Sequence, residues 1–290
     1  GDELMKIWEG LGYYSRARNM HDAAKTIESQ YGGKFPDNYE EIRNLKGVGD
    51  YTAAAVASIA FGLPYAVADG NVFRFLTRYL GIREAVDTTH GKRLVRQTAE
   101  ELLNTEHPGY HNEALMEFGA LCCIPKKPDC PRCPVQPGCF AFHHGTVNVL
   151  PVKSKKTVRK NRYFYFYVPE DEWNIIIEKR IGRDIWKNLY QFPLYEPGYE
   201  LTENEILSNA FFKELIPDSH DAIVEIGPVH LHDLTHQQIR ARFITIFQSK
   251  LSVTNRNHQK ISKEEINKFA FPVLIRNFLE EKITGQQGRN

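Results

Sequence analysis

The chain has 290 residues, of which 42% are hydrophobic and 25% are charged, and its formal net charge is +1. This length accommodates two domains, each with its own core. The near-neutral charge excludes binding of a polyanion through a global basic field, so any such binding depends on local patches. No apolar run approaches the roughly 20 residues that span a bilayer, which excludes a membrane-spanning helix.

The first half of the chain is helical in pattern. Residues 1 to about 122 alternate helix-forming stretches with glycine and proline stops. Helices are expected over Glu3–Trp8, Asp22 to Gly32, Asn38–Leu45, Asp50–Phe61, Asn71–Leu80, His90–Leu103 and His111–Cys122, with an extended stretch at Leu63–Ala68. Because the chain starts at Gly1 and is helical almost at once, we expect its start to be a cut within a longer protein.

The segment Lys46-Gly47-Val48-Gly49 separates two of these helices. Two glycines around one apolar residue allow a tight hairpin whose backbone N–H groups point outward at the start of the next helix. This geometry binds a phosphate without needing side-chain charge. The same three residues also end many ordinary helices, so both interpretations stay open.

Asp69 precedes the helix expected to begin near Asn71. The dipole of that helix should help to keep the carboxylate ionised. An aspartate in this place is either an ordinary N-cap or a carboxylate that stabilises positive charge on a substrate.

Four of the five cysteines, Cys123, Cys130, Cys133 and Cys139, lie within 17 residues. The proline-rich loops between them can wrap a metal centre but cannot form a core. One C-x-x-C pair flanked by two single cysteines favours a 4Fe–4S cluster. A structural zinc and a disulfide pair are the alternatives. We expect Cys122 to be a small buried residue.

After the cysteines the pattern changes period. Residues 148–162 read as a basic linker. Beyond it, strands are expected over Tyr163–Val168, Trp173–Glu178 and Arg242–Leu251, and helices over Glu203–Leu215 and Lys263–Lys282. The sequence therefore predicts a helical domain at 1–147 and an α+β domain at 163–290.

The hairpin and the cysteine loop together resemble the helix-hairpin-helix DNA glycosylases with a C-terminal 4Fe–4S loop. Within that superfamily, the chain is similar to the MutY-type adenine DNA glycosylases. Further matching motifs are Trp8–Arg16 (WEGLGYYSR), Asp69–Val72 (DGNV) and Asn112–Leu115 (NEAL). The resemblance covers nearly the whole chain. It implies a multidomain protein, with an all-α glycosylase domain at 1–147 followed by a MutT/Nudix-like domain at 163–290.

The resemblance also implies an activity. The family excises adenine mispaired with 8-oxoguanine or guanine from double-stranded DNA, after flipping the base out of the helix. By this resemblance Asp69 is catalytic, because its carboxylate stabilises an oxocarbenium-like sugar, and Asn71 orients it. Tyr51 stands where endonuclease III-like relatives carry a lysine. Since a phenol cannot form a Schiff base, a monofunctional enzyme with little lyase activity is expected.

Other residues receive roles by the same resemblance. Tyr13 matches the aromatic residue that intercalates beside the mispaired guanine, and Glu113 matches a residue of the adenine pocket. The remaining expected DNA contacts are the hairpin residues Lys46, Gly47, Val48 and Gly49 and the cysteine-loop residues Lys126, Lys127 and Arg132. Cys123, Cys130, Cys133 and Cys139 would hold the cluster.

In the second domain, the segment His232–His236 stands where the family carries a Phe-Ser-His loop that recognises 8-oxoguanine. Thr235 keeps the hydroxyl group and His236 the imidazole, whereas Leu234 replaces the aromatic residue. A plain polar turn between strands is the alternative. The domain lacks the glutamate-dense motif of true Nudix hydrolases, so hydrolase activity is not expected.

The family's general acid, which protonates adenine, is a glutamate upstream of the Trp8 motif, and these 290 residues do not include it. We therefore expect an adenine glycosylase whose present chain is truncated and has little activity alone. The alternatives are an endonuclease III-like glycosylase/lyase and a non-catalytic iron–sulfur DNA-binding module. The expected partner is duplex DNA with A:8-oxoguanine or A:G mispairs. A monomer is expected, located in the cytoplasm at the nucleoid if the source is bacterial.

Overall fold

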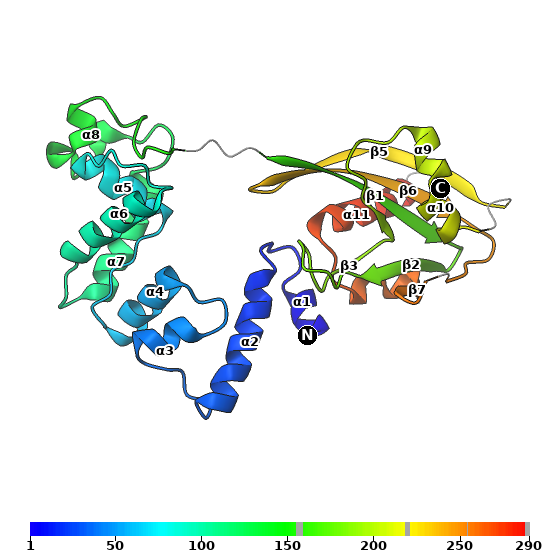
Figure 1. Cartoon of the computed structure of the whole chain (residues 1–290), viewed down its shortest axis with the longest axis horizontal. Coiled ribbons are helices and arrows are strands. Elements are labelled where there is room, and N and C mark those ends of the chain that lie inside the picture. Colours follow the sequence, from blue (N-terminus) through cyan, green and yellow to red (C-terminus); the bar gives the residue numbers. More distant parts are fainter. Residues whose placement is uncertain (155–158, 218–220, 254, 288–290) are drawn as a thin grey trace. The chain divides into compact units, whose positions relative to one another are not determined.

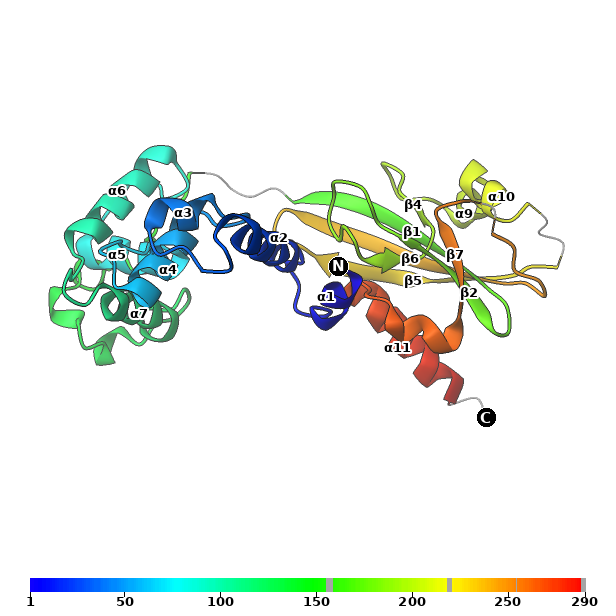
Figure 2. The same cartoon turned by 90° about the horizontal axis from the view of Figure 1, so that it is seen from below.

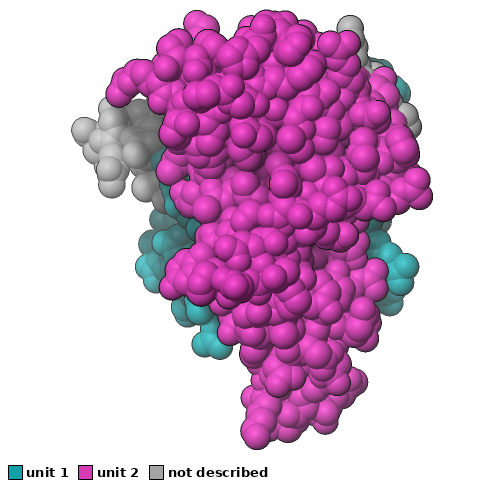
Figure 3. Space-filling view, turned by 90° about the vertical axis from the view of Figure 1, so that its left-hand side faces the viewer, with its two compact units in different colours: residues 1–18, 157–290 teal, residues 19–156 magenta. Residues whose placement is uncertain are grey.

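The structure is a computed structural model that describes residues 1–154, 159–217, 221–253 and 255–287. It divides into two compact units. Unit 1 comprises residues 1–18 and 157–290, and unit 2 comprises residues 19–156. Figure 3 colours the units separately. Among the described residues, none of the helices has the length and apolarity needed to cross a membrane.

Unit 2 is built from helices and short turns, as Figure 1 shows. They are α2 (Ser15–Gln30, whose first residues count with unit 1), α3 (Tyr39–Asn44), α4 (Asp50–Phe61), α5 (Gly70–Leu80), α6 (Thr89–Glu101), α7 (Pro108–Glu117), a π-helical turn (Phe118–Cys122), two 3-10 turns (Cys130–Arg132 and Gln136–Gly138) and α8 (Phe140–His143). One side of α5 is buried through Val72, Phe75 and Leu76, which pack with Val95 and Ala99 of α6. This packing fixes the start of α5, where Asp69 lies.

Unit 1 contains a mixed β-sheet together with helices. Its elements are α1 (Asp2–Ile7), β1 (Lys160–Glu170), β2 (Asn174–Lys179), β3 (Tyr190–Gln191), β4 (Leu194–Tyr195), α9 (Glu203–Ser208), α10 (Ala210–Leu215), β5 (Ile223–Asp233), β6 (Gln237–Phe247), β7 (His258–Ser262), a 3-10 turn (Lys263–Lys268) and α11 (Val273–Gln287). The described strands run in the order β3-β2-β1-β6-β5, with β4 on β1 and β7 on β2. β1 and β6 pair in parallel, and the other pairs are antiparallel.

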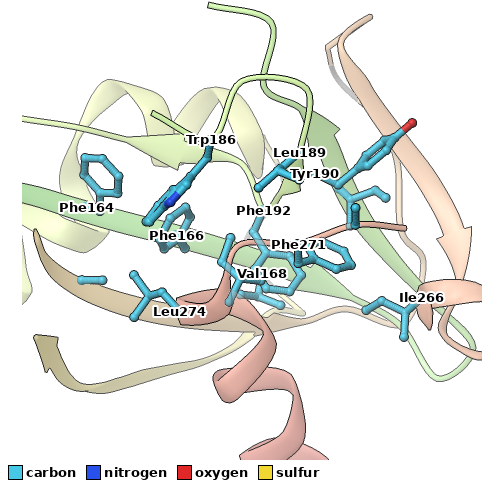
Figure 4. Close-up of a cluster of buried hydrophobic side chains, with 14 of the residues drawn as sticks. Phe164, Phe166, Val168, Trp186, Leu189, Tyr190, Phe192, Ile266, Phe271 and Leu274 are labelled. Atoms are coloured by element: carbon cyan, nitrogen blue, oxygen red, sulfur yellow. The ribbon is translucent and has the colours of Figure 1, made fainter. Parts of the chain in front are cut away.

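The sheet has an apolar core on each face because β1 alternates its large side chains. Phe164 and Phe166 lie on the face covered by α11, whereas Tyr165 and Tyr167 lie on the face covered by α9 and α10. Figure 2 shows the sheet between these helices, and Figure 4 shows the first core in close-up. The expected fold class, a helical domain followed by a MutT/Nudix-like α+β domain, is confirmed.

The N-terminal segment packs on unit 1 rather than with the other helices. Met5, Tyr14 and Ala17 are buried in the core cluster that contains Phe164 and Phe166. Polar contacts add to this packing, because Glu9 Oε1 accepts a hydrogen bond of 2.8 Å from the backbone N–H of Phe271. The compact units therefore differ from the expected limits 1–147, 148–162 and 163–290 at the N-terminus, since Gly1–Arg18 buries its apolar side chains against the sheet domain.

Several helices and strands have limits in the structure that differ from those expected from the sequence. The helix expected from Asp22 begins at Ser15, directly after the glycine-containing turn. Residues 160–162, expected in the linker, begin β1, and residues 155–158 of that linker lie outside the described residues. The strand expected at Arg242–Leu251 is β6 and begins five residues earlier, at Gln237. Cys122, expected to be buried, is exposed.

Two of the expected helices are interrupted, and the strands β3, β4, β5 and β7 were missed. Asn209 breaks Glu203–Leu215, because its side chain caps α10 by accepting a 2.8 Å hydrogen bond from Phe212 N–H. Pro272 separates the 3-10 turn from α11, since proline has no N–H to continue a helix. β5 escaped detection because a bulge between Ile226 and Val229 shifts its alternation.

Candidate functional site

Asp69 is the N-cap of α5, and hydrogen bonds hold both of its carboxylate oxygens. Oδ1 accepts from the backbone N–H groups of Asn71 and Val72, each at 2.8 Å. Oδ2 accepts from the side-chain amide of Asn71 at 3.0 Å. The capping role is compatible with the expected catalytic role, because three donors fix the orientation of one carboxylate while it lines an open cavity.

Asn71 is in turn held by a buried arginine that the sequence analysis missed. Arg74 Nη2 donates to Asn71 Oδ1 at 2.8 Å, and Nε donates to the carbonyl oxygen of Cys123 at 2.7 Å. Nη2 also donates to the carbonyl oxygen of Gly119. Arg74 therefore joins the Asp69–Asn71 pair to the start of the cysteine loop.

One turn later, Arg78 binds the cysteine loop itself. Its guanidinium donates to the carbonyl oxygens of Ile124 (2.8 Å), Pro125 (3.1 Å) and Leu150 (3.0 Å) and lies 3.4 Å from Cys123 Sγ. The side chain is almost fully buried. The available signal for Arg74 and Arg78 was their spacing of four residues, which places both on one side of α5.

The four expected cysteine ligands line one small cavity of about 30 Å³ together with Arg78 and the aromatic rings of Phe75, Tyr79, Phe118 and Phe142. Burial raises the pKa of the Cys130 thiol, and the charges of Cys123, Cys139 and Cys133 raise it further. In the described part of the chain, no group of three or more His, Cys, Asp or Glu side chains is arranged so that it could hold a metal ion. The four thiols nevertheless line one cavity, with the Arg78 guanidinium beside Cys123, and this donor chemistry fits an anionic thiolate-bound cluster.

Tyr51 lies near Asp69 on the first turn of α4. Burial raises the pKa of its phenol, and the negative charge of Asp69 raises it further, so Tyr51 is a neutral phenol at physiological pH. Its hydroxyl lies 3.7 Å from Met116 Sδ. Tyr51 lines a second cavity of about 450 Å³, which shares Arg96 with the cavity beside Asp69.

The Lys46–Gly49 segment forms the expected tight turn before α4. Gly47 has φ +80°, and a Cβ there would lie 2.3 Å from Asn19 Nδ2, so only glycine fits. Gly49 is the N-cap of α4 and offers no side chain to the first N–H groups. Those N–H groups are therefore available to an anion. Lys46 is exposed beside them.

The other expected contacts in unit 2 are on the surface. Lys126, Lys127 and Arg132 are exposed in the cysteine loop, and Arg132 lies 3.6 Å from Asp129. Glu113 is exposed on α7 and lines neither of the two cavities near Asp69 and Tyr51.

Tyr13 belongs to unit 1 and is held in a strained, exposed conformation. It has φ +47°, which is unusual for a residue other than glycine, and it is 74% exposed. The preceding turn is fixed by a 3.2 Å hydrogen bond from Trp8 Nε1 to the Gly12 carbonyl oxygen. The Arg16 guanidinium lies 5.6 Å from the ring centroids of both Trp8 and Tyr13. The fold thus presents an aromatic ring to solvent on a braced turn.

Leu234, Thr235 and His236 form the turn between β5 and β6 in the same unit. Thr235 and His236 are exposed, whereas Leu234 packs against the core cluster beneath the sheet. The preceding His232 lies 5.7 Å from the Trp186 ring centroid, and its burial lowers the pKa of the imidazole. The exposed hydroxyl and imidazole are the groups that this turn offers to a ligand.

Two family descriptions match the chain. Residues 1–105 match the HhH-GPD superfamily of base excision DNA repair proteins, and residues 164–281 match the NUDIX domain. The adenine DNA glycosylase of Buchnera aphidicola subsp. Baizongia pistaciae is 31% identical over 90% of this chain and 71% of its own length. That of B. aphidicola subsp. Acyrthosiphon pisum is 33% identical over 67% of this chain, which spans 56% of that relative. A thermostable thymine-DNA glycosylase structure has a TM-score of 0.45 and 32% identity, covering 49% of this chain and 65% of its own.

Proposed function

The chain belongs to the adenine DNA glycosylase family, and on that premise we propose that it serves to excise adenine paired with 8-oxoguanine or guanine in duplex DNA. The observation that carries the proposal is the Asp69 carboxylate, which is held by three hydrogen bonds and faces an open cavity. Breaking the N-glycosidic bond builds positive charge on the deoxyribose. A pre-oriented carboxylate beside the sugar lowers that barrier.

The remaining site residues support this reaction in different ways. Asn71 keeps the carboxylate oriented, and the turn Lys46–Gly49 with the exposed Lys126, Lys127 and Arg132 offers contacts to the DNA backbone. Glu113 is assigned to the adenine pocket through the resemblance alone. The neutral phenol of Tyr51 offers no amine for a Schiff base, so borohydride should trap no covalent adduct with DNA.

Release of adenine is the direct test. The chain, alone and with the upstream helices of a relative supplied in front of it, is incubated with a duplex that contains one A:8-oxoguanine pair. We expect release in the form that includes the upstream glutamate and its loss in Asp69→Asn. Removal of a pyrimidine with strand cleavage would instead support the endonuclease III-like alternative. DNA binding without base release in either form would support the non-catalytic alternative.

The cysteine cavity is proposed to hold a 4Fe–4S cluster through Cys123, Cys130, Cys133 and Cys139. A bound cluster supplies a rigid anchor that ties four points of the loop together. The chain's own contribution is Arg78, which holds the loop backbone and places a positive charge next to a thiolate ligand. Iron and sulfide quantification, with a visible absorbance band, tests the assignment. Zinc without iron would contradict it.

Recognition of the opposite strand is proposed to rest on Tyr13, which would intercalate, and on Thr235 and His236, which would bind 8-oxoguanine. The double variant Thr235→Ala/His236→Ala should lower the preference for A:8-oxoguanine over A:G while leaving the rate on A:G nearly unchanged. Thr202→Ala, at the N-cap of α9, is a control for a hydroxyl lost elsewhere in the unit. An unchanged preference in the double variant would remove this turn from the proposal.

A further inference from the structure

The cavity beside Asp69 is strongly basic. It has a volume of about 700 Å³, and its lining includes five cationic side chains, those of Arg74, Arg78, Lys92, Arg96 and Lys153. Among the described residues of that lining, Asp69 supplies the only carboxylate. A cavity with this balance attracts an anion, and none of the site assignments above uses Lys92 or Lys153.

The five cations differ in how much of their charge is already matched. Arg74 and Arg78 are buried and donate to backbone carbonyl oxygens. Arg96 forms a 3.1 Å ion pair with Asp50. Lys92 and Lys153 are exposed, and within the part of the chain that the structure describes, neither ammonium group has an ion pair or a hydrogen bond. These two lysines are therefore the charges available to a ligand.

Lys92 occupies a position that does not favour a cation in the absence of a ligand. It lies in the first turn of α6, where the helix dipole is positive and no acidic residue is present. The turn is rigid, because Thr88 Oγ1 accepts from Gly91 N–H at 3.0 Å and a Cβ at Gly91 would lie 2.2 Å from the Ala85 carbonyl oxygen. An anion would relieve this unfavourable arrangement.

Lys153 is carried by a segment that is tied down on both sides. Val86 N–H donates to the Val152 carbonyl oxygen at 3.0 Å. Asp87 Oδ1 accepts from the backbone N–H and the hydroxyl of Ser154, at 2.8 and 3.0 Å. The segment therefore presents Lys153 to the cavity on a fixed backbone.

We propose that Lys92 and Lys153 bind a backbone phosphate next to the sugar on which Asp69 acts, so that this cavity holds the strand that carries the excised adenine. The inference rests on the proposed function. A deoxyribose beside Asp69 is bonded to phosphates through its 3′ and 5′ oxygens, so one of them must lie close to the same cavity. Phosphate contacts of this kind position the strand without reading its sequence.

The experiment measures binding rather than excision. A labelled duplex with a tetrahydrofuran abasic analogue opposite 8-oxoguanine is titrated with the full chain at several salt concentrations. Each lost phosphate contact makes the negative slope of log K against log salt shallower by about 0.9. Lys92→Ala/Lys153→Ala should make the slope shallower by about 1 and weaken binding roughly tenfold at low salt. Lys25→Ala/Arg93→Ala, which removes two exposed cations outside the cavity, should leave the slope nearly unchanged.

A second duplex carries a neutral methylphosphonate at the phosphate 5′ or 3′ of the analogue. The modification should weaken binding by the wild type and cause no further loss in Lys92→Ala/Lys153→Ala. Equal losses in both proteins, or equal slopes in the two double variants, would overturn the inference. The inference would also be overturned if millimolar inorganic phosphate competed with DNA only when the two lysines are present and the methylphosphonate had no effect. That result would assign the cavity to a free anion. The adenine-release assay tests the proposed function separately, because neither binding measurement requires turnover.

Discussion

The side-chain amide of Asn71 donates a 3.0 Å hydrogen bond to Oδ2 of Asp69. The backbone N–H of Asn71 donates to the other oxygen, Oδ1, so one residue contacts both ends of the carboxylate. Asn71 Oδ1 is bound by Arg74, which prevents the amide from rotating away. The orientation of Asp69 therefore depends on a side chain that need not touch the substrate.

Replacing Asn71 by alanine should slow excision without weakening DNA binding. Loss of one pre-oriented donor at a catalytic group lowers the rate roughly 100-fold. Single-turnover adenine release at saturating enzyme measures the excision rate. Asn148→Ala is the control, because Asn148 lines the same cavity without a hydrogen bond to Asp69 among the described contacts. A normal rate with weakened binding would show that Asn71 contacts DNA instead.

Gly119→Ala should disturb the Asp69–Asn71 pair from the π-helical turn that contains Gly119. An added Cβ would lie 2.7 Å from the Asn71 carbonyl oxygen and 2.8 Å from Asn71 Cβ, so one of the two segments must move. We expect a loss of about 1–3 kcal/mol in unfolding free energy, together with slower excision. Denaturant unfolding measures the first effect. Gly182→Ala, where nothing lies within 4 Å, should change neither, and an unperturbed Gly119→Ala protein would contradict the packing described above.

Arg78→Met should destabilise the cysteine loop. The substitution leaves the carbonyl oxygens of Ile124, Pro125 and Leu150 without their donor, at a cost of about 3 kcal/mol, and removes the charge beside Cys123. Iron content per chain and denaturant unfolding should both fall. Arg93→Met, at an exposed position on α6, is the matched control. Full iron content in Arg78→Met would mean that the loop folds without this arginine.

Met5→Ala should destabilise unit 1 even though Met5 lies far from the sheet in the sequence. Met5 is 2% exposed in the core cluster, and truncation of such a side chain costs about 2–5 kcal/mol. Ile7 belongs to the same helix but is 79% exposed, so Ile7→Ala should cost little. Urea unfolding compares them. Equal effects would show that α1 does not pack on the sheet domain in solution.

Asp184→Asn should reduce stability in a way that depends on pH. Burial alone would raise the pKa of Asp184, but hydrogen bonds from Arg162, the Ile185 backbone and Arg180 outweigh it and lower the pKa from 3.8 to about 2. The folded pKa is therefore below the unfolded one. Its contribution to stability is present above about pH 4 and is lost as the pH falls through about 2.

Urea unfolding of the wild type and Asp184→Asn at several pH values measures this effect. The two proteins should differ by about 1 kcal/mol at pH 7 and converge toward pH 2. Glu203→Gln is the control, because this exposed glutamate has no ion pair among the described residues. A difference that is constant with pH would contradict the assigned ion pairs.

The helical half was predictable where the signals are local. Asp50–Phe61 matches α4 at both ends, because glycines stand directly outside it. The Asn38 side chain caps α3 by accepting a 3.0 Å hydrogen bond from Glu41 N–H. The start of α2 was missed, because the turn before Ser15 places Tyr13 in the left-handed region, and no local rule assigns that conformation to a tyrosine.

The candidate site was predictable only in part. The spacing of the cysteines and the position of Asp69 before a helix are local patterns, so the sequence located them. Arg74 and Arg78 looked like ordinary helix residues, since nothing local shows that their guanidinium groups reach carbonyl oxygens some 45 or more residues away. Lys92 and Lys153 come together for the same reason only in the folded chain.

From its sequence alone, this protein could be placed in a glycosylase family, divided into a helical and an α+β part, and assigned a thiolate site and a carboxylate. Those features depend on residue type and short spacing, which are properties of the chain itself. The packing of Gly1–Arg18 on the sheet domain, the arginine links from Asp69 to the cysteine loop and the basic cavity depend on contacts between distant segments. Only the tertiary structure decides these, because burial and long-range hydrogen bonding exist only once the chain has folded.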